Sequence, residues 1–264
     1  MINRINRRFK ELKSQKKKAF IAYITAGDPD LGATKKLVVA LEDSGADIIE
    51  LGIPFSDPIA DGPTIQAASY RALLKKTGLA KIFNTVFELR AHTEVPIVFM
   101  TYFNPVLKYG LARFFASCRK AGVDGVIVPD LPFEEAGDLI SLGRKSGVCT
   151  IFLAAPTSSR ERMRKIAKIS RGFVYYVSLT GVTGSGRSLQ SEISRNVKIL
   201  RSFTKKPVAV GFGVSNPAQA RRIARSADGD IVGSAIVNII AGKSNVISGV
   251  SKFARSIAKA IHSA

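Results

Sequence analysis

Residues 41–66 read LEDSGADIIELGIPFSDPIADGPTIQ and hold six of the 20 acidic residues of a 264-residue chain whose formal net charge is +20. The apolar run DIIELG, residues 47–52, predicts a buried strand, and Glu50 lies near its C-terminal end. Asp61 follows in a loop rich in Pro and Gly. Parallel barrels carry their catalytic side chains at the C-terminal ends of the strands, so Glu50 and Asp61 are the candidate catalytic pair.

The alternation of strand and helix continues on both sides of this stretch. Runs rich in Val and Ile alternate with helical patterns, several of which end at Gly, as at Gly45, Gly122 and Gly147. We expect strands at residues 19–25, 47–52, 95–101, 124–130, 148–155, 173–178, 207–213 and 230–235. This repetition favours one α/β domain over residues 1–264, a (β/α)8 TIM barrel. The alternative is a doubly wound open sheet, which the strand count and the lack of a GxGxxG turn after the first strand disfavour.

The N-terminus predicts an extra helix before the barrel. Ile2, Ile5, Phe9 and Leu12 recur at helical spacing, which indicates an amphipathic helix that packs on the barrel. The alternative for this basic leader is a transit peptide. The sequence has no apolar run near the roughly 18 residues of a membrane span and no signal-peptide core. We therefore expect a cytoplasmic protein without membrane association.

Cysteine and histidine usage predicts no metal site. Cys118 and Cys149 lie in apolar contexts that suggest burial in a reducing compartment. His92 and His262 lie outside any cluster of possible ligands and are expected at the surface or in packing.

The charge of +20 raises the alternative of a nucleic-acid-binding protein. Lys and Arg are spread along the chain, however, and only the run KSQKKK at residues 13–18 is dense. No aromatic residues are interleaved with that run, and no recognition motif is present. We expect a basic, solvated surface and no specific nucleic acid.

Three Gly-rich segments follow the last predicted strands and indicate a phosphate site. They are GVTGSG at 181–186, GFGVS at 211–215 and GSA at 233–235. Glycines let the backbone approach an anion, and the N–H groups at a helix start bind it. The alternative is tight turns without a ligand. The first segment is also long enough for a lid that excludes water, or else for a merely disordered loop.

The carboxylates and tyrosines also have structural alternatives. Glu50 could pair with a basic residue, although its apolar neighbours suggest burial without a partner, which is costly unless function requires it. Asp57 and Asp61 could cap turns. Tyr102 and Tyr175 end the third and sixth strands, as core aromatics or as hydrogen-bonding groups that face the site.

Six motifs occur in an order and spacing that closely resemble the tryptophan synthase alpha subunit family over almost the whole chain. They are AYITAGDPD, DIIELGIPFSDPIADGPTIQ, FMTYFNP, GVDGVIVPDLPFEE, YYVSLTGVTG and GFGVS. The resemblance implies a barrel that cleaves indole-3-glycerol phosphate to indole and glyceraldehyde 3-phosphate. It also implies an alpha2beta2 complex with a beta subunit that carries pyridoxal phosphate and receives the indole, and no cofactor in this chain.

The resemblance also implies roles for single residues. Glu50 matches the catalytic acid and base, and Asp61 matches the carboxylate that accepts a hydrogen bond from the indole N–H. Tyr175 matches a tyrosine that lines the site near Glu50, and Thr183 matches the lid threonine that meets Asp61 when the lid closes. The other matches line the indole, at Tyr23, Met100, Tyr102 and Val128, or the phosphate, at Gly184, Gly213, Gly233 and Ser234.

Two other functions stay open at this stage. A different phosphate-binding barrel enzyme, such as an isomerase or a thiamine-phosphate synthase, would need a catalytic Lys, His or metal-binding carboxylates at strand ends, and none is evident. A non-catalytic activator of a beta subunit would not need Glu50 and Asp61, both of which are present.

Overall fold

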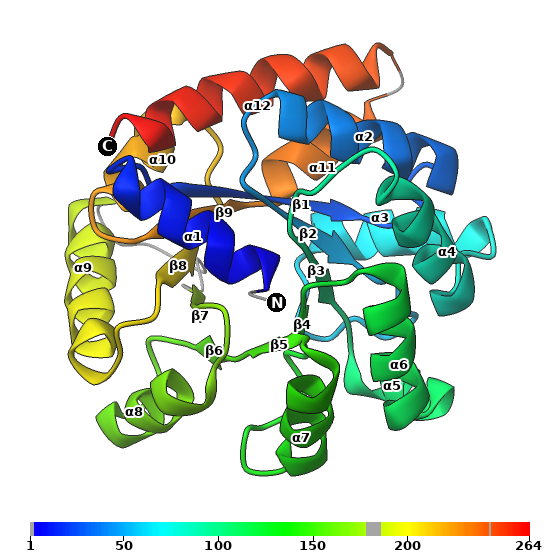
Figure 1. Ribbon diagram of the computed structural model, residues 1–264. Coiled ribbons are helices and arrows are strands. Elements are labelled where there is room, and N and C mark those ends of the chain that lie inside the picture. Colours follow the sequence, from blue (N-terminus) through cyan, green and yellow to red (C-terminus); the bar gives the residue numbers. More distant parts are fainter. Residues whose placement is uncertain (1–2, 178–185, 243) are drawn as a thin grey trace.

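The computed structural model describes residues 3–177, 186–242 and 244–264, with the side chains of 187–189 left aside. Within them, the strands run parallel in one sheet, in the order β5-β4-β3-β2-β1-β9-β8-β7-β6 (Figure 1). The strands are β1 (Ala19–Thr25), β2 (Ile48–Gly52), β3 (Ile97–Met100), β4 (Gly125–Ile127), β5 (Cys149–Ile151), β6 (Leu153–Ala154), β7 (Val174–Val177), β8 (Val208–Gly211) and β9 (Gly229–Val232).

One stretch of chain joins the two edges of this sheet. β5 pairs with β4, and β6 pairs with β7, with Phe152 alone between the two short strands. The fifth predicted strand, 148–155, is thus present but divided in two. The predicted TIM barrel is confirmed.

Helices surround the strands, and Figure 1 shows them as an outer ring. They are α1 (Arg4–Ser14), α2 (Leu31–Asp43), α3 (Pro63–Leu74), α4 (Leu79–Leu89), α5 (Phe103–Tyr109), α6 (Leu111–Ala121), α7 (Gly137–Ser146), α8 (Arg160–Ile169), α9 (Gly186–Phe203), α10 (Pro217–Ala224), α11 (Ser234–Ala241) and α12 (Val246–His262). No helix in the described part of the chain is long and apolar enough to cross a membrane.

The period of two along each strand creates two cores. In β1, Phe20 and Ala22 pack outward beneath the helices, whereas Ile21 packs into the barrel interior. The interior cluster also contains Ile5 and Phe9 from α1, which lies across the N-terminal end of the barrel (Figure 1). The predicted packing of this amphipathic helix is confirmed for Ile5, Phe9 and Leu12, whereas Ile2 lies outside the described residues. Burial of each such side chain contributes roughly 1.5–3 kcal/mol.

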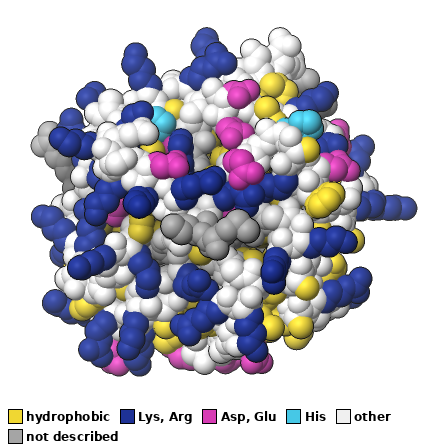
Figure 2. Space-filling model, viewed as in Figure 1, with side chains coloured by type: hydrophobic (Ala, Val, Ile, Leu, Met, Phe, Trp, Pro, Cys, Tyr) yellow, Lys and Arg dark blue, Asp and Glu magenta, His cyan; other side chains and the backbone are white. Residues whose placement is uncertain are grey.

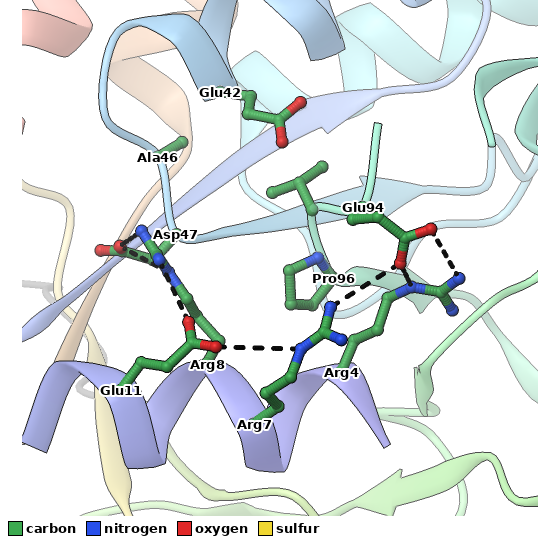
Figure 3. Close-up of a pocket in the computed structure, with 10 residues that line it drawn as sticks. Arg4, Arg7, Arg8, Glu11, Glu42, Ala46, Asp47, Glu94 and Pro96 are labelled. Carbon is green, nitrogen blue, oxygen red and sulfur yellow. Dashed lines mark hydrogen bonds and ion pairs between the residues drawn. The ribbon is translucent and has the colours of Figure 1, made fainter. Parts of the chain in front are cut away.

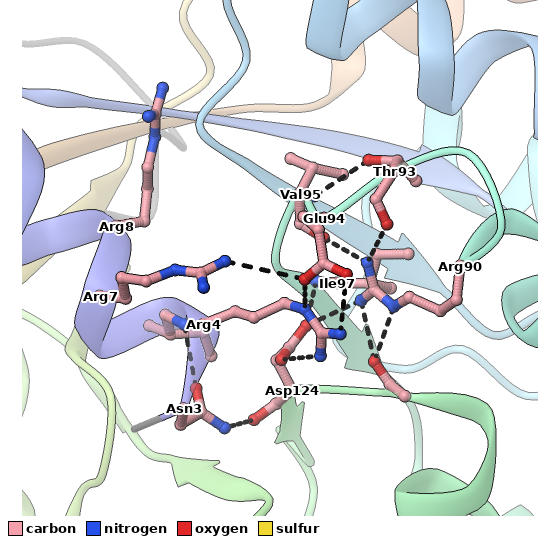
Figure 4. Close-up of polar contacts among 12 residues, drawn as sticks. Asn3, Arg4, Arg7, Arg8, Arg90, Thr93, Glu94, Val95, Ile97 and Asp124 are labelled. Carbon is pink, nitrogen blue, oxygen red and sulfur yellow. Dashed lines mark hydrogen bonds and ion pairs between the residues drawn. The ribbon is translucent and has the colours of Figure 1, made fainter. Parts of the chain in front are cut away.

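Buried aspartates fix α1 to the barrel. Asp47 and Asp124 directly precede β2 and β4, and each carboxylate accepts a backbone N–H of the neighbouring strand, from Phe20 at 2.7 Å and from Ile97 at 2.9 Å. The Nη2 of Arg8 lies 2.6 Å from Asp47 Oδ1, and the Nη1 of Arg4 lies 3.3 Å from Asp124 Oδ1. Figure 4 shows Arg4 reaching Asp124 from the helix. Each aspartate therefore joins two strands and the helix.

His262 belongs to the same network, which corrects its expected role as a surface or packing residue. Its Nε2 lies 2.9 Å from Asp47 Oδ2, a contact between residues 215 positions apart that the docking of α12 creates. A cavity of about 330 Å³ beside this network is lined by Arg7, Glu11 and Glu94 among others (Figure 3). It lies at the end of the barrel opposite the predicted site. Its charged side chains pair with one another, except that Glu42 accepts a hydrogen bond from the Thr93 hydroxyl.

We expect Asp47→Ala to lower the free energy of unfolding by about 3–5 kcal/mol, because Arg8 and the Phe20 N–H would lose a buried partner. Urea denaturation measures the change. The control is Glu94→Ala. Glu94 likewise pairs with an arginine of α1, Arg4, but its side chain is 65% exposed, so the substitution should lower the free energy of unfolding by less than about 1 kcal/mol. Equal losses in the two variants would contradict a special role for the buried aspartate.

Candidate active site

Glu50 lies near the end of β2 with its carboxyl buried in the barrel. Its strand position is opposite Tyr23 of β1 on one side and Val98 of β3 on the other. The residue is 1% exposed, and its Oε2 has no hydrogen-bond partner among the described residues. Burial first, and the negative charge of Asp61 second, raise the pKa of Glu50 to about 8. The side chain therefore carries a proton at neutral pH.

Asp61 lies in the turn that leads into α3. Its Oδ2 accepts a hydrogen bond from the hydroxyl of Tyr102 at 3.0 Å, and that hydroxyl accepts one from the backbone N–H of Ala60 at 2.9 Å. Burial raises the pKa of Asp61, but the Tyr102 hydrogen bond opposes this change. No described residue donates such a hydrogen bond to Oε2 of Glu50. The two environments therefore separate the pKa values of the two carboxyls, so that Asp61 ionises at a lower pH than Glu50, which keeps its proton.

Two glycines make room for the tyrosines beside these carboxyls. A Cβ on Gly52 would lie 2.1 Å from the Tyr23 hydroxyl oxygen, and one on Gly211 would lie 2.6 Å from that of Tyr175. Burial raises the pKa of both phenols, and nearby negative charges raise it further, those of Asp61 and Glu50 for Tyr23 and chiefly that of Glu50 for Tyr175. The sequence interpretation missed the role of Gly52 and Gly211, because only the strand register reveals which side chain crosses each glycine.

The structure brings Met100 to this space but not Val128. Met100 packs with Tyr23 and with the interior cluster. Val128 packs in the outer core beneath the helices, whereas the preceding residue, Ile127, belongs to the interior cluster. Because successive side chains of a strand alternate between faces, Ile127 replaces Val128 as the residue that faces the interior.

The predicted phosphate residues lie at neighbouring strand ends. Gly213, after β8, has a φ of +62°, which favours glycine. Gly233 caps the start of α11 without a side-chain hydrogen bond, and Ser234 is its exposed first residue, so the N–H groups of this helix start are available to an anion. A Cβ on Gly233 would lie 3.3 Å from Cβ of Tyr23, which links this end to the carboxyls.

Two predicted residues, Thr183 and Gly184, lie outside the described residues, as does most of the predicted lid. No group of three or more His, Cys, Asp or Glu side chains in the described part of the chain could hold a metal ion. The arrangement thus offers one neutral carboxyl, one carboxylate and a helix start for an anion.

Known proteins match this chain over nearly its full length. The tryptophan synthase alpha chain family matches residues 9–262. The tryptophan synthase alpha chain of Geobacter sulfurreducens is 52% identical over 238 residues, 90% of each chain. That of a Thermoanaerobacter species is 45% identical over 259 residues, 97% of this chain and 98% of the relative.

Solved structures show the same similarity in three dimensions. The tryptophan synthase subunit alpha of Legionella pneumophila superimposes with a TM-score of 0.92 at 39% identity, over 99% of each chain. A tryptophan synthase chain of M. tuberculosis gives a TM-score of 0.89 at 34% identity, over 98% of this chain and 99% of that one. Sequence and fold agree, and the chain belongs to the tryptophan synthase alpha chain family.

Proposed function

We propose that Glu50 and Asp61 carry out the reaction of this family, the retro-aldol cleavage of indole-3-glycerol phosphate to indole and glyceraldehyde 3-phosphate. The observation that carries the proposal is the buried carboxyl of Glu50, whose Oε2 has no hydrogen-bond partner among the described residues and whose pKa is raised to about 8, beside a second carboxyl at Asp61. A neutral acid of this kind can donate a proton at neutral pH and take one back in a later step.

The reaction needs two proton transfers at one position. Glu50 first protonates C3 of the indole ring, which leaves a cation in the ring and a carboxylate on Glu50. That carboxylate then takes the proton of the side-chain hydroxyl next to C3. As the C–O bond becomes a carbonyl, the carbon–carbon bond breaks and its electrons return to the ring. Indole and the aldehyde leave, and Glu50 is again protonated.

Asp61 stabilises the cation that forms between these steps. Its carboxylate accepts a hydrogen bond from the ring N–H, and Tyr102 holds it in position through the 3.0 Å hydrogen bond. Tyr23, Met100, Ile127 and Tyr175 line the ring.

The substrate phosphate binds at the other end of the site. The backbone N–H groups of Gly213, Gly233 and Ser234 contact it. Those at the start of α11 are free to do so because no side chain caps this helix. We also assign Thr183 and Gly184 to substrate binding, as the family resemblance implies, although both lie outside the described residues. No cofactor is needed in this chain.

The family implies a beta subunit as the partner, and that subunit binds the pyridoxal phosphate. We assign an alpha2beta2 assembly in the cytoplasm. The docking face comprises Pro54–Pro58, Asn104–Pro105 and Pro129–Phe133. Exposed apolar side chains next to these segments support this choice, since Ile59 is 82% and Leu107 is 60% exposed.

The pH dependence of cleavage should follow Glu50. Its acid form predominates below pH 8 and is lost above it, so kcat/KM for indole release should fall as the pH rises through about 8. The second pKa of the substrate phosphate is about 6, so its ionisation is nearly complete by about pH 7 and does not account for a fall near pH 8. Steady-state rates between about pH 6 and 10 measure the profile. A kcat/KM that stays constant across the whole range would contradict the assignment of Glu50 as the acid.

The direct test is indole release from indole-3-glycerol phosphate by the purified chain, with and without a beta subunit. We expect release by the chain alone and a faster rate with the partner. Activation of a beta subunit without any indole release would instead favour a non-catalytic activator.

A further inference from the structure

The excess of positive charge is concentrated in one part of the fold. Residues 160–225 hold 15 of the 40 Lys and Arg residues but only 2 of the 20 Asp and Glu residues, a formal net charge of +13 out of +20. Their helices, α8, α9 and α10, follow one another around the barrel (Figure 1), and the described part of residues 160–225 is called the basic sector below. Figure 2 shows Lys and Arg side chains across the left and lower left of the molecule, where α9 and α8 lie. Lys and Arg are thus spread less evenly along the chain than the sequence analysis predicted.

Most of these cations have no acidic partner among the described residues. Arg162 pairs with Glu134 and Lys165 with Glu161, and Arg201 pairs with Asp228. Nine exposed cations of the basic sector have no carboxylate within 4.0 Å among the described residues: Arg160, Arg164, Lys168, Arg195, Lys198, Lys205, Arg221, Arg222 and Arg225. Such a surface repels itself and attracts a dense array of anions.

The cations are arranged in rows. Arg160, Arg164 and Lys168 follow one another at four-residue spacing on α8, which separates them by about 6 Å along the helix. An open groove of about 660 Å³ between α8 and α9 is lined by Arg160, Arg195 and Lys198 and by serine hydroxyls. Guanidinium, ammonium and hydroxyl donors are the groups that contact phosphate oxygens in nucleic acids.

We propose that the basic sector binds the phosphodiester backbone of double-stranded nucleic acid without reading its sequence. Ten of its 15 basic residues are Arg, the side chain that pairs best with phosphate. Single strands would need exposed aromatic rings for stacking. The Phe and Tyr residues described in this sector are buried or half-buried: Phe173, Tyr175, Tyr176, Phe203 and Phe212.

Two other polyanions fit less well. An anionic membrane would gain from apolar side chains that insert, but Ile59, Tyr70, Leu74, Phe87 and Leu107, the exposed large apolar residues of the described chain, all lie outside the sector. An acidic protein would need an apolar centre for a stable interface, and the described part of the sector exposes no large apolar side chain that could form one. The helices of the basic sector lie on the outer wall, so a duplex bound to them does not cover the strand end at which Glu50 lies.

The test measures binding of the full chain to labelled duplexes of about 20 base pairs, in two unrelated DNA sequences and one RNA sequence, at several salt concentrations. The test variant combines Arg160→Gln, Arg195→Gln and Lys198→Gln. It should bind about tenfold more weakly near 0.15 M ionic strength, and the salt slope should fall by about 0.9 for each lost phosphate contact. The control combines Lys17→Gln, Lys75→Gln and Lys120→Gln, exposed residues outside the sector, and should change affinity little.

Three results would overturn the proposal. The first is an equal loss of affinity in both triple variants, which would assign binding to net charge alone. The second is a strong preference for one of the two DNA sequences. The third is displacement of the duplex by anionic lipid vesicles at equal phosphate concentration. Indole release by both variants checks that each is folded, because none of the six positions belongs to the proposed site.

Discussion

Glu50→Gln should abolish indole release while leaving the barrel folded. The amide has nearly the same size as the protonated acid but cannot give up a proton to C3 or accept one from the hydroxyl. Loss of a general acid and base that serves two transfers should lower kcat by a factor of at least about 10²–10⁴. Single-turnover indole release measures this loss.

Stability provides the matching control for this variant. The pKa of Glu50 is raised to about 8 in the fold, far above its ordinary value of 4.5. A raised carboxyl pKa means that the unfolded state releases its proton first, so wild type loses stability as the pH rises from about 4.5 to 8. Glu50→Gln removes this loss and should be at least as stable as wild type at neutral pH. Activity within tenfold of wild type, or a collapse of stability, would refute the assignment.

Asp61→Asn should also be severely impaired, and mainly in the chemical step. An amide keeps the size of the side chain and an acceptor for Tyr102, but it has no negative charge for the cation that develops in the ring. We expect a fall in single-turnover rate of about 10²–10³, as for the removal of one group that stabilises a transition state electrostatically.

Asp57→Asn in the same loop is the matched control for Asp61→Asn. Asp57 is exposed, and its carboxylate accepts a hydrogen bond from the neighbouring Ser56 hydroxyl at 2.5 Å. Its loss of charge should leave the chemical step unchanged. A change in substrate affinity alone in Asp61→Asn, with the single-turnover rate preserved, would exclude the proposed role.

The sequence by itself determined the architecture and the central carboxyl. Strands and helices alternate so regularly that the barrel, the N-terminal helix and nearly every strand follow from local patterns. Glu50 was identifiable for the same reason, because an acidic residue among apolar neighbours at a strand end marks both burial and position.

Only the tertiary structure decided which side chains meet. Val128 and Ile127 are equivalent in the sequence, but strand pairing sets which of the two faces the interior. The space for the Tyr23 hydroxyl depends on Gly52 of the neighbouring strand, and the contact of Asp47 with His262 joins positions 215 residues apart. Local patterns report the period of a strand or helix. They do not report its register against a distant neighbour, which is fixed only when the whole barrel packs.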